Sequence, residues 1–350
     1  MTTPAAPSPL QAAIVKLAHH SPITGEDATE AFGVIMRGQA TELQIAALLT
    51  GLRVRGETSE IVAGVVRALR EVMVHLPSDD PDSLVDTCGT GGGAVTTFNI
   101  STAAALVAAG AGVRIAKHGN RSFTSRCGSA DVLEALGIVL EAPIETMAAA
   151  LEAAGIVFMY APLMHPAMRH VGPVRRELAI PTVMNIVGPL ANPAGARRQV
   201  VGVADPQRVP MLAGALLELD SIHSLVVHGE PGLDEISPLG PTHVVEVRDG
   251  KTSEWTIDPK EFGYDGFSAD ELAGGDVANN ARIITETLTS KSSSVGSEAA
   301  RAAVAMNAGA AIYVSGISPT YAAGLSLAQE ALESGAGLAA LERLRLAYAT

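Results

Sequence analysis

Glycines dominate one short stretch of the chain that has the composition of an anion site. Residues 86–102 form a short apolar run, a loop with four glycines between positions 89 and 93, and then an alanine-rich pattern typical of a helix. Glycines let backbone N–H groups approach a ligand closely. A helix beginning near Asn99 would add the positive end of its dipole. The stretch predicts a phosphate site, although a glycine run alone suits an ordinary turn equally well.

A second polar segment follows the next predicted strand. Residues 117–125 read Lys-His-Gly-Asn-Arg-Ser-Phe-Thr-Ser and combine positive charge, hydroxyl groups and a glycine. Such a set could hold a diphosphate, whereas the same charges alone would also suit a solvated loop. Both segments leave strands that we expect to be parallel, so both should lie at the carboxyl edge of one sheet. Their shared position favours anion binding.

Two further clusters could complete a site. The adjacent carboxylates of Asp234 and Glu235 follow a predicted strand. Beside phosphate loops, such a pair most simply holds Mg²⁺, which takes one or two carboxylates and completes its shell with water and substrate oxygens. An exposed acidic turn is the alternative. Arg175 lies on a predicted helix, and its guanidinium fork could orient an organic acid through two parallel hydrogen bonds.

The elements that must position these residues fall into two groups. Residues 10–76 have helical spacing of apolar residues, with capping threonines at Thr24, Thr41 and Thr58, and predict a bundle of four helices. A break at 77–83 suggests a linker. We therefore expect a helical N-terminal domain over 1–78, completed in part by helices from about 166–196, and an α/β domain over 79–350.

The α/β domain is expected to have a mostly parallel central sheet flanked by helices, because short β-type runs alternate with helical patterns. The expected strands are residues 84–88, 113–116, 156–160, 199–203 and 224–228. The remaining expected elements are a helix over 166–178, an antiparallel hairpin over 242–257 and a largely helical tail over 297–349.

Composition excludes several classes of protein. Apolar residues make up 47% of the 350 residues, and the formal net charge is −13. That charge argues against binding of nucleic acid or of an anionic membrane. The two cysteines have no metal-type spacing, no secretion signal is recognisable, and the apolar runs are far too short to span a membrane. We expect a cytoplasmic enzyme that binds its anionic ligand locally.

Five motifs, in this order, resemble the anthranilate phosphoribosyltransferase family. They are Gly-Thr-Gly-Gly from 89, Asn-Ile-Ser-Thr from 99, Lys-His-Gly-Asn-Arg-Ser from 117, Val-Arg-Arg-Glu-Leu from 174 with Asn-Ile-Val-Gly-Pro-Leu-Ala-Asn-Pro from 185, and Gly-Leu-Asp-Glu-Ile-Ser from 232. The resemblance implies a fold like that of nucleoside phosphorylases and phosphoribosyltransferases. It also implies transfer of the phosphoribosyl group of 5-phosphoribosyl 1-diphosphate to the amine of anthranilate, in tryptophan biosynthesis, by a homodimer that pairs through its helical domain.

The resemblance also implies roles for individual residues. Those expected to bind phosphoribosyl diphosphate are Gly89, Gly92, Gly93, Thr97, Asn99, Ile100, Ser101, Thr102, Lys117, His118, Gly119, Asn120, Arg121, Ser122, Phe123, Thr124, Ser125 and Ser129. Those expected to bind anthranilate are Gly89, Asn120 and Arg175, with Arg175 on the carboxylate. Ser101, Asp234 and Glu235 are expected to hold two Mg²⁺ ions per subunit, with Glu235 bridging them. His118 could assist proton removal, but the neutral aniline nitrogen needs no base before it attacks, which favours a positional role.

One departure from the family pattern concerns Gly93, which stands where the glycine motif usually continues with Asp. The loop keeps its backbone donors and loses a carboxylate, so we expect retained activity with altered affinity for the donor. Two alternatives share the expected fold. A pyrimidine nucleoside phosphorylase needs no carboxylate clamp and is usually longer. A catalytically silent nucleic-acid-binding relative should carry a basic groove, which the net charge disfavours.

Overall fold

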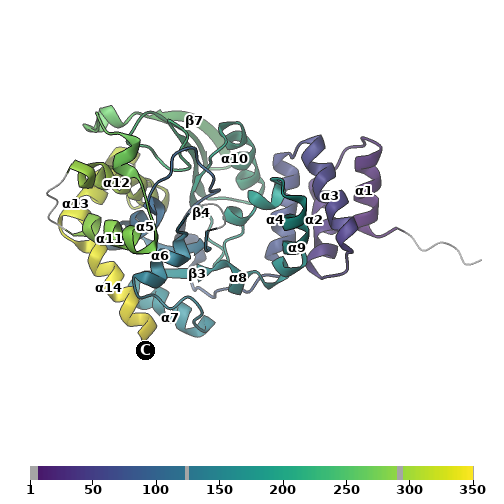
Figure 1. Ribbon diagram of the computed structural model, residues 1–350, viewed down its shortest axis with the longest axis horizontal. Helices are drawn as coiled ribbons and strands as arrows, with labels where there is room; N and C mark the ends of the chain where they lie inside the picture. Colours follow the sequence, from purple (N-terminus) through teal and green to yellow (C-terminus); the bar gives the residue numbers. More distant parts are fainter. Residues whose placement is uncertain (1–6, 123–125, 290–294, 350) are drawn as a thin grey trace, which may run out of the picture.

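The chain folds into an α/β body with a helical bundle at one end (Figure 1). The computed structural model describes residues 7–122, 126–289 and 295–349. The bundle consists of α1 (Pro9–Ala18), α2 (Gly25–Met36), α3 (Glu42–Arg55) and α4 (Ser59–Arg70). The side chains of Thr24, Thr41 and Thr58 each accept a hydrogen bond from a backbone N–H in the first turn of α2, α3 and α4. The four predicted helices and their three threonine caps are therefore confirmed.

A seven-stranded sheet with the order β3-β2-β1-β4-β5-β6-β7 forms the centre of the body. Its strands are β1 (Leu84–Gly89), β2 (Arg114–Gly119), β3 (Ile156–Tyr160), β4 (Arg198–Gly202), β5 (His223–Gly229), β6 (Thr242–Arg248) and β7 (Lys251–Ile257). The first five are parallel, and β6 and β7 add an antiparallel hairpin. The predicted fold class, a mostly parallel sheet with a helical N-terminal part, is confirmed.

Helices cover both faces of the sheet. The remaining helices are α5 (Ile100–Gly110), α6 (Ser129–Ala135), α7 (Ile144–Ala154), α8 (Ala161–Met164), α9 (Gly172–Leu178), α10 (Val209–Glu218), α11 (Val277–Leu288), α12 (Val295–Ser315), α13 (Tyr321–Glu333) and α14 (Ala336–Ala349). Short 3₁₀ helices occupy Pro81–Ser83, Pro166–His170, Val183–Asn185, Gly188–Leu190, Pro206–Arg208, Pro259–Phe262 and Ala269–Leu272. No helix in the described part of the chain is long and apolar enough to cross a bilayer.

Alternation along the strands decides which core each side chain joins. Val200 and Leu225 belong to the core beneath α5, α12 and α14, whereas the neighbouring Val201 and Val226 belong to the other core. This second core also contains apolar residues of α10 and of the N-terminal bundle. The bundle therefore packs through α10 onto one face of the sheet, and its core is continuous with that face.

Two sequence-based expectations need correction. The second strand does not end at Ala116, because pairing with β3 continues through His118 and Gly119. The helix expected over 166–178 is divided into a 3₁₀ helix and the short α9. Pro173 lies in the first turn of α9, and proline has no N–H for a helical bond to the preceding turn.

Candidate functional site

The predicted site lies where the order of the strands reverses, between β1 and β4. Strand β2 flanks β1 on one side and β4 flanks it on the other, and such a reversal leaves a crevice beyond the carboxyl ends of the strands. Gly89 and Gly202 pair at these ends. A Cβ atom on Gly202 would lie 1.6 Å from the backbone oxygen of Asp234, so only glycine lets the 232–235 segment cross here.

Asp234 fixes the glycine loop. The backbone N–H of Gly91 donates to Oδ2 of Asp234 at 2.8 Å, and the N–H of Ala94 donates to the carbonyl of Gly232, also at 2.8 Å. Gly91 and Gly92 have φ angles of 69° and 83°, which favour glycine. Burial raises the pKa of Asp234. The Asp234 carboxylate therefore holds the glycine loop over the strand ends. It lies in an environment with little access to water.

Glu235 faces the first turn of α5. Its Oε1 accepts a hydrogen bond from the backbone N–H of Ser101 at 3.1 Å, so the carboxylate lies at the positive end of the helix dipole. Burial, together with the negative charge of Asp234, raises the pKa of Glu235 to about 8. Two half-buried carboxylates side by side repel each other, and a bound cation would relieve that repulsion.

Lys117 lies in the interior rather than in an open loop. Its side chain is 3% exposed, and its Nζ donates to the backbone oxygen of Thr87 and lies 3.4 Å from Oγ of Ser101. Burial lowers the pKa of Lys117, while the charges of Asp86 and Glu235 oppose that shift. The ammonium group thus joins β1, β2 and the start of α5 behind the predicted anion site.

A buried polar cluster that the sequence did not point to fixes the end of β2. Asp86 and Asn192 have no exposed surface, and Nδ2 of Asn192 donates to Oδ2 of Asp86 at 2.8 Å and to the backbone oxygen of Ala116 at 2.9 Å. The other carboxylate oxygen of Asp86 accepts from the N–H of His118 at 3.1 Å. The Lys117–His118 end of β2 is therefore held by a residue of the distant 185–193 motif.

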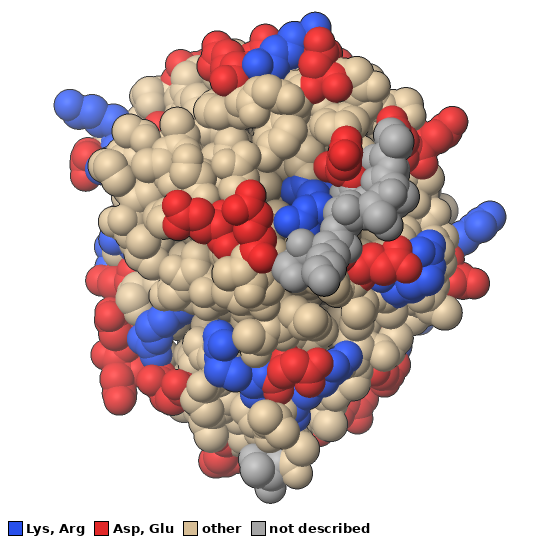
Figure 2. Space-filling view, turned by 90° about the vertical axis from the view of Figure 1, so that its left-hand side faces the viewer, with Lys and Arg blue, Asp and Glu red and all other residues tan. Residues whose placement is uncertain are grey.

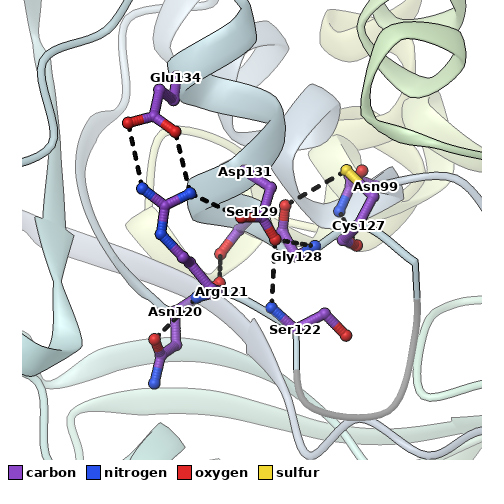
Figure 3. A network of polar contacts seen from close by, with 9 residues as sticks. All are labelled: Asn99, Asn120, Arg121, Ser122, Cys127, Gly128, Ser129, Asp131 and Glu134. Carbon is purple, nitrogen blue, oxygen red and sulfur yellow. Dashed lines mark hydrogen bonds and ion pairs between the residues drawn. The ribbon is translucent and has the colours of Figure 1, made fainter.

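Carboxylates of α6 hold the loop that follows β2 (Figure 3). Arg121 forms ion pairs with Asp131 and Glu134 at 2.8 and 2.9 Å. Oδ2 of Asp131 accepts from the N–H groups of Ser122 and Gly128 at 3.2 and 2.9 Å. The Arg121 guanidinium is thus engaged with carboxylates of its own chain, while its neighbour Asn120 keeps its side-chain NH₂ free of described partners (Figure 3).

Asn99 connects this loop to a C-terminal helix. Its Nδ2 donates to the backbone oxygen of Cys127 at 3.2 Å, and its Oδ1 accepts from Nδ2 of Asn280 in α11 at 2.9 Å. Asn280 is 2% exposed and also accepts from the N–H of Gly275 at 2.7 Å. Asn99 therefore organises the site through its side chain, and Asn280 is a second supporting residue that the sequence did not indicate.

Two histidines lie ring to ring beside the site. The ring centroids of His118 and His165 are 4.9 Å apart. Burial lowers the pKa of His118 to about 3 and that of His165 to about 4, so both are neutral at neutral pH. Nε2 of His118 and both ring nitrogens of His165 are buried without a hydrogen-bond partner among the described residues. Buried polar atoms in proteins are nearly always paired, so these nitrogens call for a partner that the described residues do not supply.

Arg175 is half-buried on α9, and no described residue forms an ion pair or a side-chain hydrogen bond with its guanidinium. Burial lowers its pKa, though the group stays charged. Arg176, the next residue, is exposed. A cation that is partly withdrawn from water and lacks a carboxylate partner is ready to accept one from a ligand.

The structure brings most of the predicted residues together, and direct contacts join Gly91 to Asp234, Ser101 to Glu235, Lys117 to Ser101 and Asn120 to Ser129. Ile100 and Thr102 lie in the first turn of α5, and Thr97 lies in the loop that precedes it. Arg175 contacts none of these groups. Phe123, Thr124 and Ser125 lie outside the described residues. Within the described ranges no cluster of three or more His, Cys, Asp or Glu side chains is arranged to hold a metal.

Comparison with known proteins agrees with this geometry. Residues 81–338 match the α/β domain of a glycosyl transferase family, and residues 11–73 match the helical bundle domain of such a family. An anthranilate phosphoribosyltransferase of Rubrobacter xylanophilus is 51% identical over 334 residues, which cover 95% of this chain and 96% of that protein.

Solved structures show the same similarity. The crystal structure of anthranilate phosphoribosyltransferase from Thermus thermophilus has a TM-score of 0.90 and 41% identity, covering 97% of this chain and 99% of that one. The Saccharomyces cerevisiae enzyme in complex with PRPP and Mg has a TM-score of 0.85 and 29% identity, covering 97% and 98%. This chain therefore belongs to the anthranilate phosphoribosyltransferase family of pentosyl-transferring enzymes.

Proposed function

We propose that this protein transfers the phosphoribosyl group of 5-phosphoribosyl 1-diphosphate to the amine of anthranilate, giving N-(5-phosphoribosyl)anthranilate and diphosphate, in tryptophan biosynthesis. One observation carries the proposal. The glycine loop and the first turn of α5 meet the acidic pair directly, through the hydrogen bonds from Gly91 to Asp234 and from Ser101 to Glu235. The groups that we propose for the phosphates and for the cation therefore lie in one crevice, which supports the proposal.

The main task of the protein in this reaction is to stabilise the leaving group. As the bond at ribose C1 breaks, positive charge develops on the sugar and negative charge on the diphosphate, and the amine must be aligned on the opposite face. The backbone N–H groups of Gly92 and Gly93 have no acceptor among the described residues and would donate to the developing anion, whereas those of Gly91 and Ser101 are held by the acidic pair. The buried Lys117 charge behind them adds a fixed positive potential. No nucleophilic side chain is required.

We further propose that Asp234, Glu235 and Ser101 bind Mg²⁺. The residues fit such an ion, because the two carboxylates are half-buried and raise each other's pKa, and because Mg²⁺ is commonly held by one or two carboxylates plus substrate oxygens. When bound, Mg²⁺ would neutralise charge on the departing diphosphate. Two ions per subunit, with Glu235 shared between them, is the arrangement that we propose.

For the acceptor, we propose that Arg175 binds the carboxylate of anthranilate, with Gly89 and Asn120 beside the ring. The partnerless guanidinium and the unsatisfied nitrogens of His118 and His165 support this placement. A neutral His118 can orient the amine through a hydrogen bond. It need not act as a base before attack, since the aniline nitrogen already carries a free electron pair.

The remaining expectations concern the organisation of the molecule. We propose a homodimer that forms through the helical domain, supported by exposed apolar side chains on α1 and α3: Val15 is 54% exposed, Leu43 84% and Val54 81%. We also propose a helical domain over 1–78 supplemented from about 166–196, an α/β domain over 79–350, and action in the cytoplasm. The separate matches over 11–73 and 81–338 support the division.

Two other functions find less support. A nucleoside phosphorylase needs no carboxylate clamp, which is the role that the partnerless Arg175 suits. A nucleic-acid-binding relative would need a broad basic surface, whereas the face that carries α11, α13 and α14 shows acidic groups interspersed with small basic ones (Figure 2).

The experiment that tests the function follows the fluorescence of anthranilate during incubation with phosphoribosyl diphosphate and Mg²⁺. We expect the fluorescence to fall as anthranilate is consumed, and to stay constant when either the donor or Mg²⁺ is left out. Phosphorolysis of thymidine and uridine and a gel shift with single-stranded DNA serve as counter-assays. Absence of turnover, or activity in a counter-assay instead, would contradict the proposal.

Gly93→Asp should raise the Michaelis constant for phosphoribosyl diphosphate several-fold and leave that for anthranilate unchanged. A Cβ at this position would lie 3.0 Å from the carbonyl oxygen of Gly232 and 3.2 Å from Oδ1 of Asp234. The new carboxylate would therefore stand beside an existing one at an anion site. Gly93→Asn, which adds nearly the same volume without charge, separates the steric from the electrostatic effect. An unchanged Michaelis constant for phosphoribosyl diphosphate in Gly93→Asp would contradict the prediction.

A further inference from the structure

Asn307 lies outside all the motifs that indicate the site, yet it contacts the acidic segment. It is on α12 and 3% exposed. Its Oδ1 accepts from the N–H of Ile236 at 2.9 Å, and its Nδ2 donates to the carbonyl oxygen of the same residue at 2.8 Å. A third hydrogen bond, from Nδ2 to the carbonyl oxygen of Ala303 at 2.9 Å, fixes the amide to its own helix.

Ile236 depends on this side chain for its backbone hydrogen bonds. Strand β5 ends at Gly229 and β6 begins at Thr242, so the connection between them has no strand neighbour at Ile236. A buried peptide N–H and C=O must be paired, and leaving them unpaired is costly. One carboxamide satisfies both groups, as an adjacent strand would. The path of the chain directly after Glu235 is therefore set by α12.

The same amide and the Glu235 carboxylate share one space. Asn307, Glu235 and Ser101 are among the residues that line a cavity of about 10 Å³, which is close to the minimum that a single water molecule needs. A shift of the Ile236 backbone would carry the adjacent Glu235 away from the N–H of Ser101. The cavity is too small for the Glu235 carboxylate to move back toward the N–H of Ser101.

We propose that Asn307 is a positioning residue, which holds the Ile236 backbone so that the Glu235 carboxylate points at the first turn of α5 and at the Mg²⁺–diphosphate part of the donor. The inference rests on the proposed function. The affinity of the cation site is then controlled from α12, a helix that supplies no ligand.

The test compares Asn307→Ala with the parent by calorimetric titration with inorganic diphosphate in the presence of Mg²⁺, and by steady-state kinetics. We expect binding of diphosphate at least about tenfold weaker, a matching rise in the Mg²⁺ concentration for half-maximal activity, and a Michaelis constant for anthranilate within about twofold of the parent's. In a Glu235→Gln background, Asn307→Ala should weaken diphosphate binding no further, because the group that it positions is gone.

Tyr313→Phe is the matched control. Tyr313 lies on the same helix and donates a buried hydrogen bond to Glu246, away from the site, so its loss should lower the melting temperature without changing diphosphate binding. If Asn307→Ala does not fold, Asn307→Asp keeps the shape and the acceptor for the Ile236 N–H and should weaken binding in the same direction. Parent-like diphosphate binding in a folded variant, or additive losses in the double variant, would overturn the inference. A parent that binds diphosphate but consumes no anthranilate would overturn the proposed function alone.

Discussion

Glu235→Gln is expected to lower kcat/KM by about two to three orders of magnitude. We propose Glu235 as a charged ligand of the cation that neutralises the leaving group; such a ligand contributes several kcal/mol, and each factor of ten corresponds to about 1.4 kcal/mol. The amide has nearly the same size and can still accept a hydrogen bond from Ser101. The loss should therefore reflect the missing charge rather than a rearranged loop. Initial rates measured over a range of Mg²⁺ concentrations test whether the loss of the charge weakens binding of the cation.

The same substitution should stabilise the protein when Mg²⁺ is removed by a chelator. The pKa of Glu235 in the folded chain, about 8, lies above the ordinary value of 4.5, so the folded state holds an extra proton between these two pH values. The metal-free parent consequently loses stability as the pH rises through that window. The melting temperature of Glu235→Gln should exceed that of the parent at pH 8 to 9 and match it near pH 5.

Glu230→Gln provides the control for both measurements, since Glu230 lies on the same connection but is exposed. It should change neither the rate nor the melting temperature. A Glu235→Gln variant with an unchanged Mg²⁺ dependence would remove this residue from the cation site. A variant that is less stable than the metal-free parent at pH 9 would show that the carboxylate supports the fold rather than the chemistry.

Arg175→Ala is expected to raise the Michaelis constant for anthranilate by about 10- to 100-fold and to leave that for phosphoribosyl diphosphate unchanged. A charge-assisted hydrogen bond contributes about 1.5–3 kcal/mol, which corresponds to this range. Arg175→Lys keeps the charge without the two-pronged geometry and should fall between the parent and the alanine variant. Consumption of anthranilate, followed by fluorescence at saturating donor, gives the constants.

The adjacent Arg176 supplies the comparison, because it is exposed on the same short helix. Arg176→Ala should behave like the parent. Equal losses in the two variants would point to a general electrostatic effect of the helix and not to a specific carboxylate contact. An unchanged constant for anthranilate in Arg175→Ala would require another residue to bind the acid.

The elements that could be predicted from the sequence are those specified by neighbouring residues. Capping threonines mark the starts of α2, α3 and α4, and the Asp249–Gly250 turn marks the hairpin of β6 and β7. The glycine loop could likewise be recognised, because the backbone freedom of glycine is a local property. The sequence does not indicate that β2 continues to Gly119, because polar residues such as Lys117 are not typical of a buried strand. Pairing with β3 keeps them in the sheet.

The supporting residues of the site could not be predicted, because they act across long stretches of the chain. Asn192 reaches Asp86 over 106 positions, and Asn280 reaches Asn99 over 181. Asn280 lies outside all five motifs, and Asn192 lies inside one whose sequence does not indicate which group its side chain contacts. Only the tertiary fold shows that these amides fix the groups that the motifs reveal.

The dependence of the site on α11 and α12 has a consequence for the protein during its synthesis. The glycine loop and the Lys117 segment leave the ribosome well before Asn280, which follows Asn99 by 181 positions. Until then Oδ1 of Asn99 lacks its partner, although Nδ2 can already donate to Cys127, so we expect the proposed phosphate pocket to be less firmly held. We therefore expect chains that end before α11 to bind the phosphoribosyl donor more weakly than the full chain.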